Sequence, residues 1–516
     1  MARWFNTAGP CKPDIHYMLP PLTRLPQLRR IIDQQGYFVL HAPRQTGKTT
    51  AMLSLAQALT DSKRYAAVMV SVEVGSVFPK NIDASELAIL ETWREDAQFY
   101  LASELHPPDW PAAPPGGRIG SALGAWAQQS PRPLVLFIDE IDSLQDNTLL
   151  SVLRQLRSGY PKRPSRFPHA LALVGLRDVR DYKIASGGSS RLTTSSPFNI
   201  KVKSLTLRNF TADEVIALYQ QHTDDTGQKF TPESVAAAFE LTQGQPWLVN
   251  ALAKEVVEEI VTDVAISIET QHVYEAKERL IKRQDTHLDS LAERLQETRV
   301  RTVIEPMLSG QTLGMASEDD RQFLIDLGLL RRDEAGKLVI ANPIYREVLP
   351  RVLSKGIQDG IPTIQPSWLK ANGQLDPDKL LEAFVAFWRQ HGQPLLQGAP
   401  YTEIAPHLVM MAFLHRVVNG DGSLEREYAI GSGRMDLCLR YRKVTVAMEL
   451  KVWAPNQPDP LLMGLEQLDK YLSGLGLEKG WLVIFDRREN LVPIAERTTT
   501  EQAKTPKDKA VTVIRG

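Results

Sequence analysis

The segment Leu40-His-Ala-Pro-Arg-Gln-Thr-Gly-Lys-Thr-Thr50 decides the fold of the first half of this chain. The apolar run 37–40 predicts a short buried strand, and from Thr49 onward apolar residues recur at helical spacing. A strand, a loop ending in Gly-Lys-Thr and a helix bring backbone N–H groups and a helix N-terminus to one point. The segment therefore predicts a cradle for phosphate groups.

The loop departs from the usual phosphate-binding pattern at its first position. Ala42 stands where glycine is usual, whereas Gly47, Lys48 and Thr49 are intact. Alanine weakens the match, because glycine alone is free of steric cost at positive φ. A chance Gly-Lys-Thr in a basic loop is the alternative interpretation. The residues predicted to surround the nucleotide are Ala42, Pro43, Gln45, Thr46, Gly47, Lys48, Thr49 and Thr50.

A second apolar strand, residues 133–138, ends in the carboxylates Asp139 and Glu140. A P-loop ATPase needs carboxylates at such a strand end, because one holds Mg²⁺ and the other polarises the attacking water. We assign the first role to Asp139, together with the Thr49 hydroxyl, and the second to Glu140. ATP and Mg²⁺ are the cofactors that these two motifs predict.

Further apolar strands are predicted at 65–73 and 170–176, with helical segments between them. Strands that alternate with helices imply a parallel sheet, whose ligand lies beyond the carboxyl ends of the strands. Arg177 directly follows the last of these strands, so we expect it to contact the γ-phosphate. The alternative is an ion pair with the nearby Asp178 or Asp181.

The composition is that of a soluble globular protein. At 516 residues, with 43% hydrophobic and 23% charged residues, the chain should hold roughly three or four domains. No run of 18 apolar residues occurs, and the first residues contain no apolar signal region. Cys11 and Cys438 lack the spacing of a disulfide framework or a zinc site. We therefore expect a cytoplasmic protein that makes no membrane contact.

The net charge of −1 gives no global bias toward nucleic acid, so such binding would need local patches. The segment 151–177 contains no acidic residue but several cations, and it is either a contact surface or a solvated, turn-rich face. The proline-rich segment 1–36 leaves a second choice open. His16 and Tyr17 either stack on a nucleotide base or pack with this lead-in on the core.

From Phe210 the pattern turns helical, with a capping box formed by Thr211 and Glu214. Within this helical lid the tripeptide Gly244-Gln245-Pro246 occurs. With the phosphate loop and the Asp139-Glu140 strand, it resembles the STAND branch of AAA+ ATPases over roughly residues 1–260. The resemblance implies that Pro246 lies near the nucleotide and that the ATPase acts as a switch.

The domain order follows from these patterns. Residues 298–355 combine helices with a turn and a short strand, an order that is similar to a winged helix, for which we favour packing against the lid over DNA binding. Residues 356–375 are rich in turn formers, which predicts a linker. The predicted domains are the ATPase core 1–205, the helical lid 206–297, the winged-helix-like domain 298–355, the linker 356–375 and a C-terminal α/β domain 376–516.

The C-terminal domain contains a second candidate site. Alternating segments around 435–439 and 444–450 predict a hairpin that brings Asp436 near Glu449, with Lys451 on the same face as Glu449. Carboxylate oxygens suit Mg²⁺, and the lysine can orient or help to deprotonate a nucleophilic water. The set is therefore suited to metal-dependent hydrolysis of a phosphodiester.

The order Asp436, then Glu449-Leu450-Lys451, resembles the PD-(D/E)xK nucleases, whose fold is restriction-endonuclease-like; Met435 replaces the usual proline. Within this resemblance, Gln467 and Tyr471 match a Gln-xxx-Tyr element that often follows the Glu-x-Lys strand. The resemblance further assigns metal binding to Asp436, Glu449 and an additional acidic ligand, Glu403. A capping role for Glu403, with Glu425 or Glu427 in its place, is the alternative.

The two resemblances together imply an ATP-regulated, Mg²⁺-dependent endonuclease, with DNA as the expected substrate and a STAND-like switch. Such a pairing is similar to those of prokaryotic antiviral defence or mobile-element control, with a homo-oligomer and a protein or phage-derived trigger as further partners. The first alternative is a nucleotide-dependent DNA-binding scaffold with an inactive nuclease fold. The second is a DNA-translocating ATPase.

Overall fold

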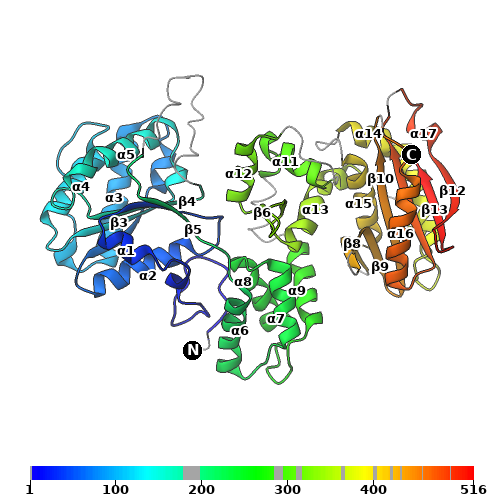
Figure 1. Ribbon diagram of the computed structural model, residues 1–516, viewed down its shortest axis with the longest axis horizontal. Coiled ribbons are helices and arrows are strands. Elements are labelled where there is room, and N and C mark those ends of the chain that lie inside the picture. Colours follow the sequence, from blue (N-terminus) through cyan, green and yellow to red (C-terminus); the bar gives the residue numbers. More distant parts are fainter. Residues whose placement is uncertain are drawn as a thin grey trace. The chain divides into compact units, whose positions relative to one another are not determined.

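The computed structural model shows an α/β protein whose described residues form a five-stranded, a six-stranded and a two-stranded sheet (Figure 1). The chain divides into two compact units, the first made of residues 1–283 and 321–343 and the second of residues 284–320 and 344–516. The structure describes residues 3–177, 198–283, 294–308, 316–361, 366–398, 404–418, 422–430, 433–455, 457–488 and 490–516.

Among its described residues, the first unit contains a parallel five-stranded sheet in the order β2-β3-β4-β1-β5. The strands are β1 (Tyr37–His41), β2 (Ala66–Ser71), β3 (Leu134–Asp139), β4 (Ala170–Gly175) and β5 (Lys203–Thr206). The predicted parallel α/β core is confirmed. The carboxyl end of β1 leads into the phosphate loop, and β3 ends at Asp139.

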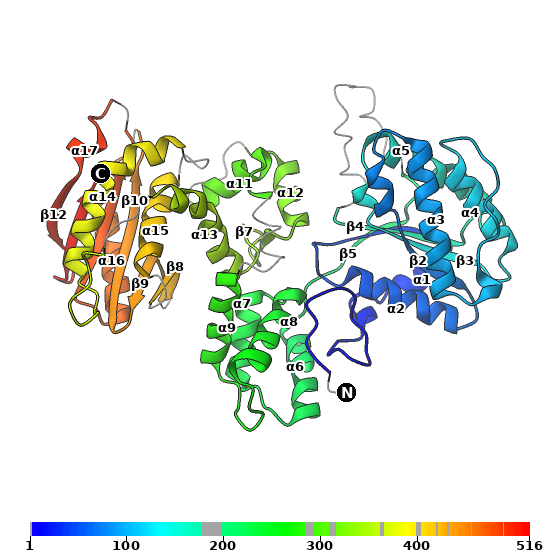
Figure 2. The same cartoon turned by 180° about the vertical axis from the view of Figure 1, so that it is seen from behind.

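Helices cover both faces of this sheet (Figure 2). Alternate residues of β1 project to opposite faces, as the period of two for a strand requires. Phe38 and Leu40 join the core under α1 and α2, whereas Tyr37 and Val39 join the core under α3, α4 and α5. These helices are α1 (Leu28–Asp33), α2 (Lys48–Asp61), α3 (Ile82–Tyr100), α4 (Arg118–Gln129) and α5 (Asp146–Gly159).

A helical lid follows the sheet within the first unit. It consists of α6 (Ala212–Thr226), α7 (Pro232–Thr242), α8 (Pro246–Glu255), a π-helical turn (Val256–Ile260) and α9 (Thr270–Arg283). Thr211 and Glu214 form the predicted capping box at the start of α6. Pro246 is the first residue of α8, a position that tolerates proline because its missing N–H would have no helical partner.

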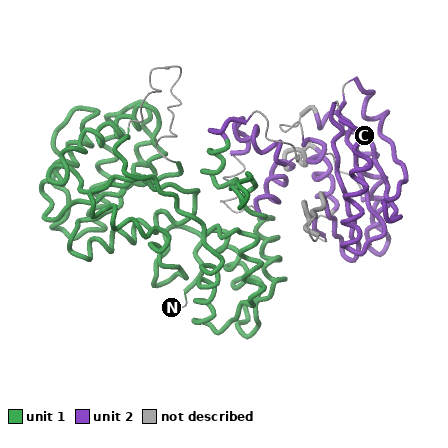
Figure 3. The backbone as a smooth tube through the Cα atoms, viewed as in Figure 1, with its two compact units in different colours: residues 1–283, 321–343 green, residues 284–320, 344–516 purple. Residues whose placement is uncertain are grey.

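The described residues of 298–308 and 316–360 form two helices, a short hairpin and a further helix. The elements are α11 (Thr298–Leu308), α12 (Glu318–Asp326), β6 (Leu330–Arg332), β7 (Leu338–Ile340) and α13 (Pro343–Gly360). The segment from Arg321 to Pro343 belongs to the first unit (Figure 3). Helix α13 continues past residue 356, where the sequence predicted a linker, because glycine in a helix interior costs only about 1 kcal/mol and does not stop the helix.

The second unit contains, in the part that the structure describes, a mixed six-stranded sheet in the order β12-β13-β11-β10-β9-β8. Its strands are β8 (Gly422–Ile430), β9 (Gly433–Tyr441), β10 (Val444–Trp453), β11 (Lys479–Asp486), β12 (Thr499–Lys504) and β13 (Ala510–Arg515). Its helices are α14 (Pro377–Gly398), α15 (Ala405–Val418), α16 (Leu461–Leu475) and α17 (Ile494–Arg497). No helix in the described parts of the chain has the length and apolar character that crossing a bilayer requires.

Candidate nucleotide and metal sites

The phosphate loop has the backbone of an anion cradle. Helix α2 begins at Lys48, and its N-cap Gly47 has a φ of 91°, which favours glycine. Gln45 is also left-handed, with a φ of 58°, whereas Ala42 is not among the residues with positive φ. Alanine is therefore compatible with the first position of this loop, since the left-handed turns fall at Gln45 and Gly47.

The side chains of the loop converge with β3. Lys48 Nζ donates hydrogen bonds to the carbonyl oxygens of Ala42 (2.8 Å) and Pro43 (2.9 Å). Thr49 Oγ1 donates to Asp139 Oδ2 at 3.0 Å. A hydroxyl and a carboxylate oxygen in contact are a donor set that Mg²⁺ accepts in nucleotide sites. Thr49 and Asp139 therefore fit the metal that the sequence predicts.

Burial shifts the pKa of the charged groups in this site. Burial raises the pKa of Asp139 and of Glu140, the latter with a further contribution from the Asp139 charge. Burial lowers the pKa of Lys48. Glu140 has a φ of 55°, a strained value for a residue with a side chain, and such strain is concentrated at functional positions. A metal ion and phosphate groups would compensate these desolvated charges.

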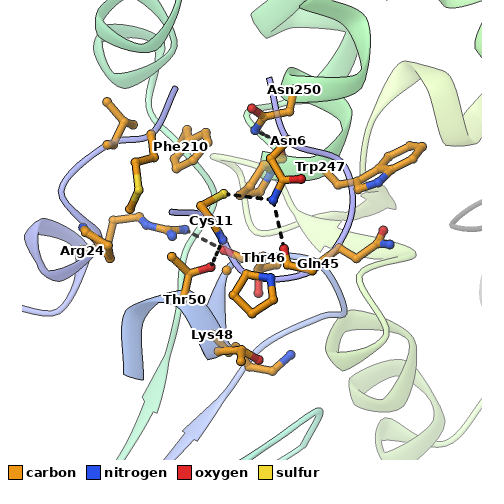
Figure 4. A pocket seen from close by; sticks show the side chains of 18 of the residues that line it. Asn6, Cys11, Arg24, Gln45, Thr46, Lys48, Thr50, Phe210, Trp247 and Asn250 are labelled. Atoms are coloured by element: carbon orange, nitrogen blue, oxygen red, sulfur yellow. Dashed lines mark hydrogen bonds between the residues drawn. The ribbon is translucent and has the colours of Figure 1, made fainter. Parts of the chain in front are cut away.

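A cavity of about 470 Å³ opens beside the loop (Figure 4). At one end are predicted residues of the loop, with Glu140 nearby; the other end is made by the N-terminal lead-in and the lid. The predicted nucleotide residues that line the cavity are Gln45, Thr46, Gly47, Lys48, Thr49, Thr50 and Pro246. Ala42, Pro43 and Asp139 contact Lys48 or Thr49 from behind the lining.

Arg24 lines the cavity without having been predicted from the sequence. Its guanidinium donates to the carbonyl oxygens of Thr46 (3.1 Å) and Arg208 (2.9 Å) and lies over the Phe210 ring at 4.9 Å. Burial lowers the pKa of Arg24 to about 10. The residue thus connects the lead-in, the phosphate loop and the start of the lid through one partly buried cation.

The aromatic residues of the lead-in pack on the protein itself. The Tyr17 ring lies 4.8 Å from Phe5 and 5.6 Å from His222, although Tyr17 also reaches the cavity lining. His16 lies edge-on to Trp4 at 4.9 Å. These contacts favour the packing interpretation of the two residues over base stacking.

A close backbone contact explains the glycine of the Gly-x-Pro tripeptide in the lid. Phe210 N donates to the carbonyl oxygen of Gly244 at 2.8 Å, so the two backbones are in direct contact. A Cβ at Gly244 would lie 1.9 Å from the Phe210 carbonyl oxygen, and its φ is +69°. Glycine therefore allows the lid to approach Phe210, and Pro246 is placed on the cavity wall.

Arg177 lies away from the cavity lining. Its Nε donates to Asp326 Oδ2 at 3.2 Å, and its guanidinium lies over the Phe323 ring at 4.9 Å. Asp178 and Asp181, the partners considered from the sequence, lie outside the described residues. The described partner of Arg177 comes instead from α12, and a contact of Arg177 with a γ-phosphate stays a prediction.

The predicted antiparallel hairpin is formed by β9 and β10. Ala447 pairs with Cys438 and Met448 with Leu437; Glu449 follows Met448 in β10, and Asp436 precedes Leu437 in β9. The side chain of Asp436 is outside the described part of the chain. Lys451 Nζ donates to Glu449 Oε1 at 2.5 Å, and Glu449 is only 2% exposed.

Glu449 and Lys451 lie on the sheet face that α16 covers. Both share the face of Ala447, because every second residue of a strand points to the same side, and Ala447 belongs to a buried cluster with Tyr471 of α16. Gln467, one helical turn before Tyr471, has a buried Oε1 without a hydrogen-bond partner among the described residues. The Gln467 oxygen and the Glu449 carboxylate are oxygen atoms of the kind that Mg²⁺ prefers, whereas the Lys451 ammonium has no lone pair for a metal and could only orient a water or a phosphate group.

The remaining metal ligands that the resemblance predicts stay predictions. Glu403 lies outside the described residues, and the same holds for the side chains of Glu425 and Glu427. Among the side chains that are described, no group of three or more His, Cys, Asp and Glu residues is placed to hold a metal ion.

Neither protein-family models nor curated protein sequences match this chain. Solved structures are similar to it at low sequence identity. The Walker-type ATPase paby2304 of Pyrococcus abyssi is 12% identical with a TM-score of 0.47, over 67% of this chain and 99% of the other. The ORC2 protein of Aeropyrum pernix is 14% identical with a TM-score of 0.39, over 65% and 92%. The RuvB Holliday junction branch migration motor of Thermotoga maritima is 16% identical with a TM-score of 0.33, over 62% and 89%.

Several residues of the far end of the cavity were missed from the sequence. Asn250 could have been found, because it lies four residues after Pro246 and so on the same face of α8. Asn6 and Arg24 carry no local signal, since Asn6 lies in irregular backbone and Arg24 ends a single 3-10 turn (Pro21–Arg24). Trp247 could not be predicted as a cavity residue from local sequence, because it is positioned through a contact with Thr7, which lies 240 residues earlier in the chain.

Proposed function

We propose that this chain is an ATP-regulated, Mg²⁺-dependent nuclease. The observation that carries the nucleotide half is the convergence of Lys48, Thr49 and Asp139 at the carboxyl edge of a parallel sheet, beside a cavity of about 470 Å³. The cavity volume lies within the range of small-molecule sites, roughly 300–1,000 Å³. The phosphates would lie at the N-terminus of α2, where backbone N–H groups and the helix dipole favour negative charge.

Each residue of the nucleotide site has a role in this proposal. Lys48 leaves the carbonyl oxygens of its own loop and neutralises the β- and γ-phosphates. Thr49 and Asp139 hold Mg²⁺. Glu140 orients the water that attacks the γ-phosphorus, and the bond from phosphorus to the bridging oxygen breaks as the new bond forms. Arg24 supplies a second cation at the loop, because its Nη2 would lie 3.1 Å from a Cβ added at Gly47.

The nuclease half rests on the pair formed by Glu449 and Lys451 on β10, with Asp436 on the neighbouring strand β9. Carboxylates at these positions would hold Mg²⁺, which offsets charge that develops on the phosphodiester. Lys451 orients the water, whose oxygen bonds to phosphorus as one ester P–O bond breaks. The partly buried Gln467, with its unpartnered oxygen, supports a polar ligand at this face.

The ion pair between Arg177 and Asp326 supports a switch. Arg177 follows β4, at the sheet edge where the γ-phosphate would lie, yet it is held by a carboxylate of α12. A γ-phosphate could compete with Asp326 for this cation, which would couple nucleotide state to the winged-helix-like segment. If the protein serves in antiviral defence or mobile-element control, a trigger or a change of oligomeric state would alter the competition between Asp326 and the γ-phosphate for Arg177.

The exposed face of α5 and of the turn after it supports a nucleic-acid partner. Arg154, Arg157, Lys162 and Arg166 are all exposed, and the segment 151–177 contains no acidic residue. Phosphate groups bind such surfaces through charge, with an affinity that falls steeply with salt. DNA is the nucleic acid that we propose, in a complex that brings it to the nuclease site.

The two activities can be tested separately. The nucleotide half predicts Mg²⁺-dependent ATP hydrolysis that is lost in Lys48→Ala and in Glu140→Gln. The nuclease half predicts Mg²⁺-dependent cleavage of plasmid, linear DNA or single strands that is lost in Lys451→Ala and kept in Lys479→Ala, an exposed lysine on β11 of the same sheet.

Two outcomes would favour the other functions. No cleavage of any DNA or RNA, with normal ATP binding, would favour a nucleotide-dependent scaffold. ATP turnover that long DNA strongly stimulates, in a stable ring, would favour a translocating motor.

A further inference from the structure

The cavity wall contains a buried amide with an unused acceptor. Asn250 is 7% exposed and lines the cavity. Its Nδ2 donates to the carbonyl oxygen of Pro246 at 2.8 Å. This bond distinguishes the nitrogen of the Asn250 amide from its oxygen and so fixes the position of Oδ1. Asn250 Oδ1 has no hydrogen-bond partner among the described residues. A buried oxygen that lost its bond to water on folding is unfavourable, so it indicates a donor supplied by a ligand.

Asn250 lies at the end of the cavity that is remote from the phosphate loop. Figure 4 shows Asn250 and Lys48 at opposite ends, with Asn6 and Trp247 beside Asn250. If the phosphates occupy the N-terminus of α2, as the proposed function requires, the rest of a nucleotide extends toward Asn250. The base is therefore the part of the ligand that reaches this amide.

The N–H groups of the neighbouring side chains are already engaged. Asn6 Nδ2 donates to the carbonyl oxygen of Gly9 at 3.1 Å, and Trp247 Nε1 donates to that of Thr7 at 2.9 Å. The Nδ2 of Asn250 is held by Pro246 in the same way. Among the polar atoms of these three side chains, Asn250 Oδ1 is the buried one without a partner in the described part of the chain, so the group they hold ready for the base is an acceptor.

We propose that Asn250 selects adenine, by accepting a hydrogen bond from the 6-amino group of the base on Oδ1. This group is the only N–H donor on the base of a neutral adenine nucleotide. Guanine and hypoxanthine carry an oxygen at the same position, and two acceptors would then face each other in a buried site. The inference rests on the proposed nucleotide site and deepens it, since it names the residue that sets base preference.

The test compares three Mg²⁺-bound triphosphates that differ at position 6 of the purine. They are ATP with an amino group, purine riboside triphosphate with a hydrogen, and inosine triphosphate with an oxygen. Full-length wild-type protein should bind ATP about tenfold more tightly than either analogue, the size expected for one buried hydrogen bond. Asn250→Leu should bind ATP about tenfold more weakly and the three ligands nearly alike, because the acceptor is gone.

The matched control is Asn147→Leu, the same substitution at an exposed position of α5 outside the cavity lining, which should keep the wild-type preference. Equal affinity of the wild type for all three ligands would overturn the inference while leaving the nucleotide site intact. An unchanged preference in a folded Asn250→Leu protein would overturn it as well. Binding of none of the three by the wild type would overturn the proposed nucleotide site itself. The ligand series on the wild type decides the question even if the variant fails to fold.

Discussion

Arg177 and Asp326 form an ion pair that is almost completely removed from solvent. Arg177 Nε lies 3.2 Å from Asp326 Oδ2, and the two side chains are 9% and 4% exposed. Gln322 donates a further hydrogen bond to Asp326 at 2.8 Å. The pair joins the end of β4 to the end of α12, across 149 residues of sequence. The cation that follows β4 is thus engaged by a carboxylate of α12.

Removing one partner of this pair should be costly. Asp326→Ala leaves the Arg177 cation buried without its carboxylate, so we expect a loss of about 3–5 kcal/mol in the free energy of unfolding. Arg64→Ala is the control, because the pair of Arg64 with Asp33 is exposed and should contribute under about 1 kcal/mol. Urea unfolding of the first unit, followed by tryptophan fluorescence, measures both. Equal small losses in the two variants would show that the buried pair contributes nothing.

The lid glycine offers a steric test. Gly244→Ala would place a Cβ 1.9 Å from the Phe210 carbonyl oxygen, so the lid must move away from Phe210 and the cavity wall must open. We expect ATP affinity to fall at least about tenfold, since a misplaced wall no longer packs against the base. Gly227→Ala is the matched control, because Gly227 also has a positive φ, +80°, but nothing lies within 4 Å of its Cβ.

The control should therefore lose only the cost of the left-handed backbone, about 1–2 kcal/mol of stability, and keep ATP affinity. Isothermal titration with Mg²⁺-ATP and thermal unfolding of both variants separate these effects. If the two variants bind ATP equally well, the contact between Gly244 and Phe210 does not shape the cavity.

Much of the parallel sheet could be predicted because its strands are local, continuous apolar runs, as strands buried on both faces require. β1 to β4 arise from such runs. β5 was not predicted, because Leu205 is the buried residue of this edge strand and its sequence contains no apolar run. In the second unit, β12 was missed for a related reason, since its residues are exposed or partly exposed.

The candidate nucleotide site divides in the same way. Its phosphate end could be predicted because Gly47, Lys48 and Thr49 are consecutive and their chemistry is local. Its far end could not, because the lead-in and the lid meet there through tertiary packing, as in the bond from Trp247 to Thr7. The partner of Arg177 could not be predicted for the same physical reason, because Asp326 lies 149 residues away on α12 and meets Arg177 only through tertiary packing.

The carboxylates at the end of β3 predict a pH dependence. Burial raises the pKa of Asp139 and of Glu140, so the folded protein binds these protons more tightly than the unfolded chain. The nucleotide-free protein should therefore gain stability as pH falls through the window between the raised pKa values and the ordinary ones near 4. Mg²⁺-ATP needs the ionised carboxylates, so its affinity should fall across that same window.

Titrations of Mg²⁺-ATP binding at a series of pH values measure this dependence. Asp139→Asn supplies the control, because it removes the titrating ligand and should flatten the profile while weakening binding. An affinity that stays constant down to the ordinary carboxyl pKa, about 4, would contradict the assignment.

The basic face of α5 predicts salt-dependent binding of nucleic acid. The double variant Arg154→Glu with Arg157→Glu should weaken DNA binding and reduce the slope of log affinity against log salt by about 2, one for each phosphate that is no longer neutralised. Arg29→Glu with Arg30→Glu is the control, since these exposed cations lie on α1, which covers the opposite face of the sheet. Fluorescence anisotropy at several salt concentrations compares them. If the two double variants weaken DNA binding equally, the loss comes from the change in net charge and not from the basic face of α5.

We propose that nucleotide bound at Lys48 controls cleavage at Glu449 and Lys451. The most direct test is the rate of Mg²⁺-dependent plasmid cleavage by wild type, Lys48→Ala and Lys451→Ala, each with and without ATP. We predict that ATP changes the wild-type rate, that Lys48→Ala cleaves at the same rate with and without ATP, and that Lys451→Ala does not cleave in either condition. Cleavage that persists in Lys451→Ala, or a response to ATP that persists in Lys48→Ala, would contradict the account.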